Sequence, residues 1–238
     1  MEIPDMQHQL MGYDRSATMF SPDGHILQVE YAEKTVRLGS ASIGMLCKDG
    51  VVIIADKGFK DELIVQKSAE KIYEIDEHII ASAAGILSDA RILINQTRLI
   101  AQQHRVTYDS PIEVESVIRE IADIQQQFTQ YPGARPFGVA LMIAGKNGDD
   151  FKLYTSDITG NYFEYKSVAI GENDEKIKED LRKRHKKENT IEENIKLGFD
   201  IFKKVLGNKF DASRFNVAYV GKEGKLKRLT EKEIEKYK

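Results

Sequence analysis

The sequence predicts an α+β fold in which two antiparallel sheets pack together and helices cover their outer faces. Segments with strand-like patterns come in blocks, near residues 42–84 and again near residues 138–170. Segments with helical spacing come in pairs, between the blocks and after them. Regular alternation of strands and helices would instead indicate βαβ units and a parallel sheet, so this order favours antiparallel sheets with helices outside.

A turn and a short helix precede the first block. The turn is expected at residues 21–24, where serine, proline, aspartate and glycine follow one another. The apolar residues after it recur at intervals of three and four: Ile26, Val29, Ala32 and Val36. This spacing is typical of an amphipathic helix, and Gly39 is a suitable residue to end it. The pattern predicts a helix over about residues 24–38.

The first block reads as a meander of four strands. Asp49-Gly50 is a typical hairpin turn between two β-rich segments. Asp76-Glu77 separates the next two segments. The expected strands are residues 42–47, 51–55, 72–75 and 78–84.

Two long helices and a second strand block follow. Helical spacing runs over residues 88–106, and again over residues 114–128 after Pro111. Turn residues such as Gly145 to Gly148 then separate the strand-like segments 138–144, 152–155 and 162–170. The C-terminal third adds two helical patterns, a strand at residues 215–220 and a last charged helix.

Composition excludes several classes of protein. The 238 residues fit one soluble domain, and a single cysteine, Cys47, cannot form an internal disulfide framework. No apolar run reaches the roughly 18–20 residues of a membrane span, so we expect a cytoplasmic protein without a membrane partner. The formal net charge of −3 argues against a chain built mainly to neutralise nucleic-acid phosphates.

Common catalytic and metal-binding signatures are missing. The sequence contains no P-loop, no dinucleotide fingerprint, no H-E-x-x-H and no nucleophile elbow, so no cofactor is expected. The five histidines lack ligand spacing, so no metal site is expected. The basic run 182–187 has no interleaved aromatic residues and lies between acidic runs, which favours a solvated helix end over nucleic-acid binding.

One N-terminal stretch carries more information than a core-forming pattern. Three short motifs follow in a fixed order: Tyr13-Asp14-Arg15, then Phe20 to Gly24, then Gln28 to Ala32. This run resembles the N-terminal signature of 20S proteasome α subunits, and the archaeal ones in particular. The resemblance continues to about residue 171, and its further motifs are Glu70-Lys71-Ile72, Asp89-Ala90-Arg91, Arg135-Pro136-Phe137-Gly138 and Ala169-Ile170-Gly171.

The resemblance implies the four-layer αββα sandwich of N-terminal-nucleophile hydrolases. It also implies a flexible gate tail at residues 1–12, followed by one α-type domain over residues 13–238. Proline at position 4 and the lack of periodicity in the first five residues agree with a mobile tail, and Gly12 would be its hinge.

The function implied is that of a non-catalytic subunit of an outer seven-membered ring. Its expected partners are further α subunits, β subunits that carry the active sites, a ring-shaped AAA+ ATPase, and unfolded polypeptides in transit. By the resemblance, the gate is held open by Tyr13, Asp14, Pro22 and Tyr31. The C-terminus of the ATPase would dock at Lys71, Gly24, Ile26 and Gly39. The alternative for Lys71 is an exposed lysine at a strand end.

Two alternative functions stay open, and the sequence departs from the family pattern at positions that include Glu33 and Pro132. By the resemblance, Ser40 stands at the position of the catalytic nucleophile, Lys71 at that of the catalytic lysine and Asp56 at that of the acidic partner. Autolysis before Ser40 would therefore give an N-terminal-nucleophile amidohydrolase. A free-standing scaffold protein without β partners is the other alternative. Glu33 stands where the family commonly has arginine. Pro132 replaces a glycine, which predicts a stiffer loop.

Overall fold

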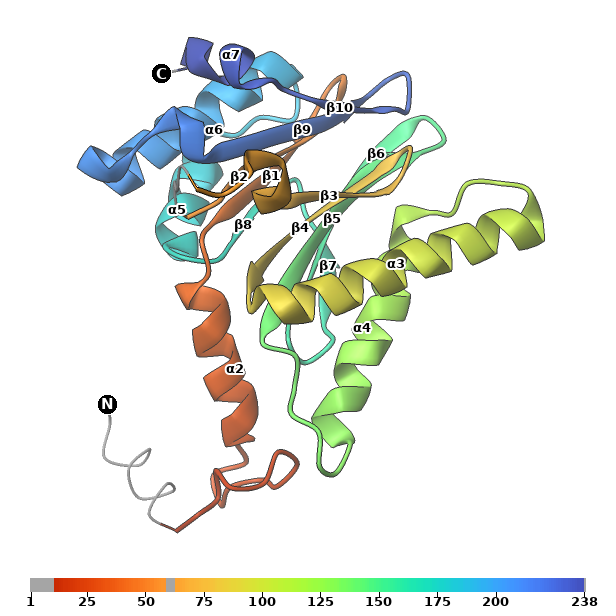
Figure 1. Cartoon of the computed structure of the whole chain (residues 1–238), viewed down its shortest axis with the longest axis vertical. Helices are drawn as coiled ribbons and strands as arrows, with labels where there is room; N and C mark the ends of the chain where they lie inside the picture. The colour runs from red at the N-terminus through yellow and green to blue at the C-terminus, as the bar shows by residue number, and fades with distance from the viewer. Residues whose placement is uncertain (1–10, 59–62, 238) are drawn as a thin grey trace.

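Two five-stranded antiparallel sheets lie face to face in the computed structural model, which describes residues 11–58 and 63–237 (Figure 1). The first sheet has the order β10-β9-β2-β1-β8, and its strands are β1 (Ser42–Cys47), β2 (Gly50–Asp56), β8 (Ser167–Ile170), β9 (Phe215–Gly221) and β10 (Leu226–Arg228). The second has the order β3-β4-β5-β6-β7, with β3 (Ile72–Asp76), β4 (Ile79–Gly85), β5 (Val139–Asn147), β6 (Asp150–Ser156) and β7 (Tyr162–Glu164).

Helices cover the outer faces of both sheets. α3 (Leu87–Tyr108) and α4 (Val114–Gln130) pack on the second sheet, and α5 (Asp174–Arg184) and α6 (Ile191–Leu206) pack on the first. A short helix, α7 (Glu231–Ile234), lies near the C-terminus (Figure 1). The α+β sandwich with the layer order helix, sheet, sheet, helix is therefore confirmed.

The apolar core divides into three layers that match this order. One cluster joins the first sheet to α5 and α6, a second joins the other sheet to α3 and α4, and the third lies between the sheets. Both faces of β1 and β2 are consequently covered, and every residue of these two strands is buried. This explains why the sequence of β2 is a continuous apolar run and does not alternate.

The N-terminal helix is α2 (Leu27–Leu38), and it lies at one end of the sandwich (Figure 1). It begins about three residues later than the spacing predicted and ends at Gly39, as expected. Its C-terminal turn is attached to the second sheet, because Thr35 Oγ1 donates a hydrogen bond to the Gly138 carbonyl at 3.0 Å. The predicted hairpin between β1 and β2 forms, but its two-residue loop is Lys48-Asp49, because Gly50 already pairs with Cys47 as the first residue of β2. The four-strand meander predicted for this block is wrong, because β1 and β2 lie in one sheet and β3 and β4 in the other.

The segment 162–170, predicted as one strand, is two strands in different sheets. β7 pairs with β6 in the second sheet, and β8 pairs with β1 in the first. The chain crosses between them at Tyr165, whose N–H donates to Leu153, and Lys166, whose carbonyl accepts from Leu46. The three-residue strand β10 was not predicted. No helix within the described ranges is long and apolar enough to cross a membrane.

Candidate functional site

Ser40, Asp56 and Lys71 meet at the end of the sandwich next to α2. Ser40 lies just before β1, Asp56 ends β2, and Lys71 lies directly before β3. The antiparallel pairing of Ser42 with Ala55 brings the beginning of β1 beside the end of β2. The fold therefore assembles these three residues from positions far apart in the sequence.

The ammonium group of Lys71 is surrounded by oxygen atoms of the same chain. Its Nζ lies 2.7 Å from Ser40 Oγ and 3.2 Å from the carbonyl oxygen of Asp56, and it also donates to the carbonyl oxygen of Ser40. Lys71 is only 4% exposed. The interpretation of Lys71 as an exposed lysine at a strand end is therefore wrong.

Burial changes the proton affinity of this lysine. Removal from water disfavours the charged form and lowers the pKa of Lys71 to about 7, although the nearby Asp56 carboxylate acts in the opposite direction. A lysine in this state exchanges its proton close to neutral pH, which ordinary lysines do not.

Further residues that the sequence did not single out hold this cluster in place. Arg214 donates from Nε and Nη2 to the two carboxylate oxygens of Asp56, at 3.2 and 2.8 Å. The Gly58 N–H donates to the same carboxylate, and Asn216 Oδ1 accepts from the N–H of Lys71 at 2.9 Å. Arg214 and Asn216 lie in the C-terminal third, where the sequence offered no motif.

A hydroxyl beside an amine of lowered pKa is an arrangement that can activate the hydroxyl as a nucleophile. Ser40, however, lies within the chain, so its own nitrogen belongs to a peptide bond. The carbonyl oxygen of Gly39, on the other side of that bond, accepts a hydrogen bond from the Glu172 N–H. The backbone on both sides of Ser40 is thus held by the sandwich.

The predicted gating residues lie in the segment before α2 and in α2 itself. Tyr13 and Asp14 are in a turn, and the carbonyl oxygen of Asp14 accepts from Gln28 Nε2 at 2.6 Å, which ties this turn to the helix. Pro22 is exposed in the next turn, and Tyr31 lies on α2, with Lys34 Nζ 5.2 Å from the centre of its ring. Residues 1–10 of the expected gate tail lie outside the described residues.

The predicted activator-binding residues fall at both ends of α2. Gly24 has a φ of +81° in the turn before the helix, and Ile26 is its N-cap. Gly39 and Lys71 lie beyond its other end. The twelve residues of α2 span about 18 Å at 1.5 Å per residue, so one chain does not bring the two groups together.

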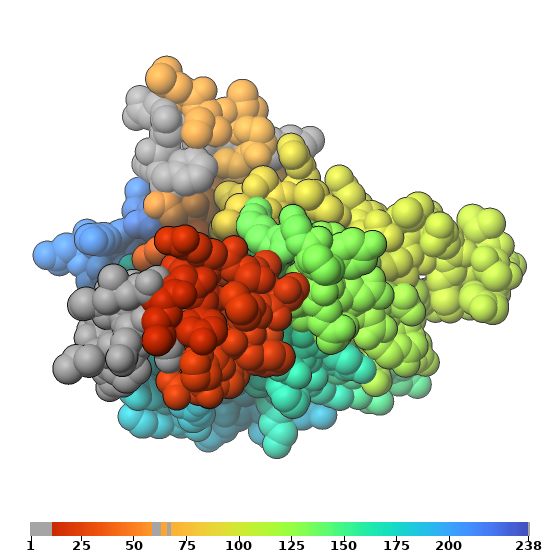
Figure 2. All heavy atoms as spheres, turned by 90° about the horizontal axis from the view of Figure 1, so that it is seen from below, coloured from red at the N-terminus to blue at the C-terminus, as the bar shows by residue number. Residues whose placement is uncertain are grey.

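The N-terminal segment also borders the loop that follows α4. Figure 2 shows these two segments, in red and green, side by side on one face. A shallow pocket of about 460 Å³ lies between them and is lined by residues 15–18, Gln28 and residues 132–135. The loop is anchored by Arg135, which donates to both carboxylate oxygens of Asp89, at 2.6 and 2.8 Å. Pro132, the departure from the family pattern, lies at this pocket.

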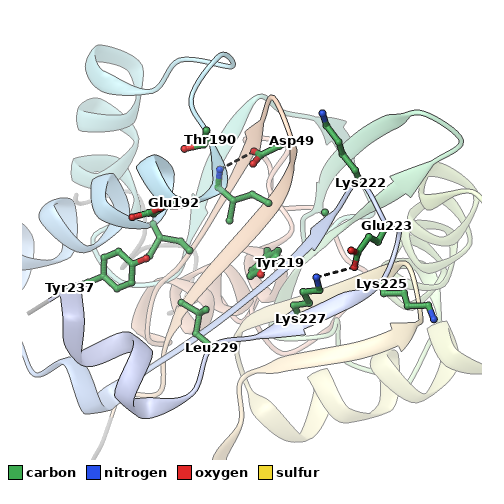
Figure 3. A pocket seen from close by; sticks show the side chains of 13 residues that line it. Asp49, Thr190, Glu192, Tyr219, Lys222, Glu223, Lys225, Lys227, Leu229 and Tyr237 are labelled. Atoms are coloured by element: carbon green, nitrogen blue, oxygen red, sulfur yellow. Dashed lines mark hydrogen bonds and ion pairs between the residues drawn. The ribbon is translucent and has the colours of Figure 1, made fainter.

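A larger groove lies elsewhere on the described part of the chain. It has a volume of about 550 Å³ and lies between the start of α6 and strands β9 and β10. Figure 3 shows Tyr219, Leu229 and Tyr237 along its walls. It includes Asp49, in the turn at the far end of β1 from Ser40, so it is separate from the Ser40–Lys71 cluster. Within the described part of the chain, no group of three or more histidine, cysteine or acidic residues has the geometry for a metal ion. The basic residues 182–184 form the exposed last turn of α5, as expected for a solvated helix end.

Comparisons with known proteins give one consistent result. A family model described as "Proteasome subunit" matches residues 36–220, and a second model, for the N-terminal signature of the A-type proteasome subunits, matches residues 13–34. The chain is 42% identical over 227 residues to the proteasome alpha subunit of Pyrococcus abyssi, which covers 95% of this chain and 86% of that protein. It is 41% identical over 228 residues to the proteins of the same name from Methanosarcina acetivorans and Archaeoglobus fulgidus, covering 95% of this chain and 92% of each relative.

Proposed function

Because this chain belongs to the α-type family of proteasome subunits, we propose that it is a non-catalytic subunit in the outer seven-membered ring of a cytoplasmic 20S core particle. Membership implies assembly into proteasome rings with β subunits. In this proposal the β subunits carry the threonine nucleophiles, and the α ring controls the entry of unfolded polypeptides. The observation that carries it is the N-terminal signature, which forms an ordered segment ahead of α2 and leaves Ser40 inside the chain.

The absence of catalysis by this chain is supported by how the backbone before Ser40 is packed. A side chain at Gly39 would place its Cβ 2.3 Å from the backbone nitrogen of Gly85, so α2 approaches the second sheet too closely for any other residue. Leu27, Val29 and Ala32 of the same helix are buried. Cleavage before Ser40 would release a helix whose apolar face is part of the core.

The gate is proposed to use hydrogen bonds between the N-terminal segments of neighbouring copies. Tyr13 and Asp14 are half-buried and Pro22 is exposed in one copy, which leaves them near the surface where a second copy would reach them. We expect Tyr13→Phe or Asp14→Ala to impair opening, because each removes a hydrogen bond worth about 0.5–1.5 kcal/mol per subunit, repeated around the ring. The measurement is peptide hydrolysis stimulated by an activator. Unchanged stimulation in both variants would contradict the assignment.

Docking of a C-terminal carboxylate is proposed at Lys71, in a pocket shared by two adjacent copies. A shared pocket is supported by the separation within one chain of Gly24 and Ile26 from Gly39 and Lys71. If each copy contributes a different end of α2, the four residues can line one site. The proposed ligand is the tail of a ring-shaped AAA+ ATPase, which ends in a hydrophobic residue, a tyrosine and a final residue. Its carboxylate would form a charge-assisted hydrogen bond with Lys71.

Native mass spectrometry of the full chain, expressed alone and together with a β subunit, tests the main proposal. Rings of seven or fourteen unprocessed 27.0 kDa subunits, and a larger complex with a processed β chain that begins with threonine, are expected. Rings that never capture a β subunit would favour a free-standing scaffold. A chain of reduced mass that begins at Ser40 would overturn the proposal.

One observation favours a second candidate function, the self-processed amidohydrolase. The distance of 2.7 Å between Ser40 Oγ and Lys71 Nζ suits proton transfer from the hydroxyl. This candidate requires a free amine on Ser40, so the subunit mass decides between the two.

A further inference from the structure

Two aliphatic side chains project into solvent from the connection between β2 and β3. Leu63 is 93% exposed and Val65 is 73% exposed, and a short 3₁₀ helix (Gln66–Ala69) follows them and leads into β3. Figure 2 shows this part of the chain, in orange, standing out from the body of the molecule. A single exposed apolar residue is ordinary, but neighbouring ones that project together are typical of a surface that contacts another protein. Leu63 and Val65 are called the apolar knob below.

The opposite side of the second sheet carries an exposed aromatic ring beside a hollow. β7 is the edge strand there, and Phe163 on it is 61% exposed. The hollow next to Phe163 has a volume of about 210 Å³, and its lining residues come from both sheets, near the point where the chain crosses from β7 to β8. Its apolar lining consists of Val36 at the end of α2, Phe163, Tyr165, and Val168 and Ile170 on β8.

Most charged side chains at this hollow already have partners within the chain. The Asp157 carboxylate accepts from two N–H groups of its own turn, at 2.8 and 3.0 Å. Lys178 Nζ donates to the Asp174 carboxylate at 2.6 Å. Arg37 is exposed and stays in contact with water. What remains for a partner is the apolar lining, so the hollow suits an apolar side chain better than an ion or a polar small molecule.

One copy of the chain cannot bring its knob to its own hollow. The strand order β3-β4-β5-β6-β7 places the two features at opposite edges of the second sheet. Figure 2 shows the same separation, with the segment before β3 in orange at one side of the molecule and the region of β7 in blue-green at the other. A contact between them therefore needs two copies and uses a different surface on each. Such a heterologous contact builds a ring when its rotation closes, whereas contact between two identical surfaces stops at a dimer.

Building on the proposed outer ring, we propose that Leu63 and Val65 of one copy pack against Phe163 and the hollow beside it on the next copy, and that this heterologous contact joins neighbours around the ring. Burial of these three side chains removes apolar surface from water at every boundary. Each copy turns its knob toward one neighbour and its hollow toward the other. A closed ring therefore covers all of these surfaces, whereas an open chain of copies would leave one knob and one hollow in water.

Native mass spectrometry of the full chain, expressed alone, tests this contact with two charge substitutions. Leu63→Asp places a carboxylate on the knob, and Phe163→Asp removes the aromatic ring and places a carboxylate at the hollow. An unpaired carboxylate buried at a contact is costly, so each variant should give monomers at a concentration where the wild type gives rings. Both positions are exposed in the single copy, so the fold itself should be unchanged, and the circular dichroism spectrum checks this.

A control variant and a mixture make the test specific. Val106→Asp is the control, because Val106 is 86% exposed but lies near the C-terminal end of α3, and it should keep rings of seven. The mixture contains Leu63→Asp and Phe163→Asp, one of them labelled with a heavy nitrogen isotope. The Phe163→Asp copy keeps an intact knob and the Leu63→Asp copy keeps an intact hollow. The two should therefore form a mixed dimer that cannot extend into a ring.

The outcomes distinguish this contact from the function on which it rests. Rings of the wild type and of the control, monomers of each variant alone and mixed dimers in the mixture support the contact. Rings that persist in Leu63→Asp and Phe163→Asp leave the proposed function intact and overturn the contact. Monomeric variants that form no mixed dimer also overturn it, because the two surfaces then do not meet each other. A wild type that forms no ring, alone or with a β subunit, overturns the proposed outer ring and this contact with it.

Discussion

Replacing Arg135 by methionine tests whether the loop after α4 is held by one charged contact. The Asp89 side chain is 7% exposed and accepts two hydrogen bonds from the Arg135 guanidinium and one from the Gly138 N–H at 2.9 Å. Methionine keeps much of the length of arginine but cannot donate. The variant therefore leaves a buried carboxylate with only its backbone donor.

The expected loss lies between two reference cases. Exposed ion pairs contribute about 0.2–1 kcal/mol, whereas breaking a fully buried pair costs about 3–5 kcal/mol. Here the carboxylate is buried but the Arg135 side chain is 58% exposed, so solvent weakens the attraction. We expect the free energy of unfolding to fall by about 2 kcal/mol at pH 7.

The loss should depend on pH in a defined direction. Hydrogen bonds from Arg135 are the largest contribution that lowers the pKa of Asp89 below its ordinary value. A carboxyl whose pKa is lower in the folded state adds stability above its unfolded pKa of about 3.9, and that stability is lost as the pH falls through the folded value. The difference between the wild type and Arg135→Met should thus be full at pH 7 and shrink below about pH 4.

Urea unfolding at pH 7, 4 and 2.5, at one fixed subunit concentration, measures this difference. Arg91→Met is the matched control, because Arg91 is exposed on α3, the helix that carries Asp89, and has no hydrogen-bond partner among the described residues. It should change the free energy by less than about 0.5 kcal/mol. An unchanged midpoint for Arg135→Met at pH 7, or a loss that stays the same at pH 2.5, would refute the reasoning.

Two further pairs of substitutions probe backbone geometry and helix capping. Gly85 has a φ of +119°, and a Cβ there would lie 2.2 Å from the Gly138 carbonyl oxygen, so Gly85→Ala should prevent stable folding; Gly148→Ala, at a positive φ but in open space, should cost only about 1 kcal/mol in urea unfolding. Thr190 caps α6 through a reciprocal capping box, so Thr190→Ala should cost about 1 kcal/mol in urea unfolding. The Thr230 hydroxyl at the start of the four-residue α7 donates to Glu233 but does not accept from its N–H, so Thr230→Ala should cost less, and equal losses would contradict the importance of the cap bond.

Local sequence patterns predicted most elements because they report features within a few residues. The helical spacing before Gly39 and the turn residues near Asp49 are local, and both elements form within about three residues of the predicted positions. The division of residues 162–170 between two sheets cannot be predicted from local spacing. It depends on which strands lie beside Tyr165 and Lys166, and those partners are more than ten residues away in the sequence. Strand β10 was missed because three residues provide too little alternation to read.

The site shows the same limit more strongly. Ser40 and Lys71 are 31 residues apart, and only the family resemblance suggested that they belong together. The resemblance could not tell that Lys71 is buried and that its three donors are used within the chain. Arg214, 158 residues from the Asp56 carboxylate that it neutralises, belongs to no recognised motif. Its role appears only when the sheet brings the start of β9 beside the end of β2.

The close packing around Gly39 connects the state of Ser40 to the stability of the whole N-terminal segment. Cleavage of the Gly39–Ser40 bond would separate α2 from β1. The Gly39 carbonyl, which accepts a hydrogen bond from the Glu172 N–H, would then lie at a free chain end. The apolar side of α2 and the bond from Thr35 to Gly138 would then have to hold the helix alone. Under the proposed function, a hydroxyl placed 2.7 Å from an amine does not make this chain catalytic, because the segment that cleavage would detach contains the proposed gate and buried residues of α2.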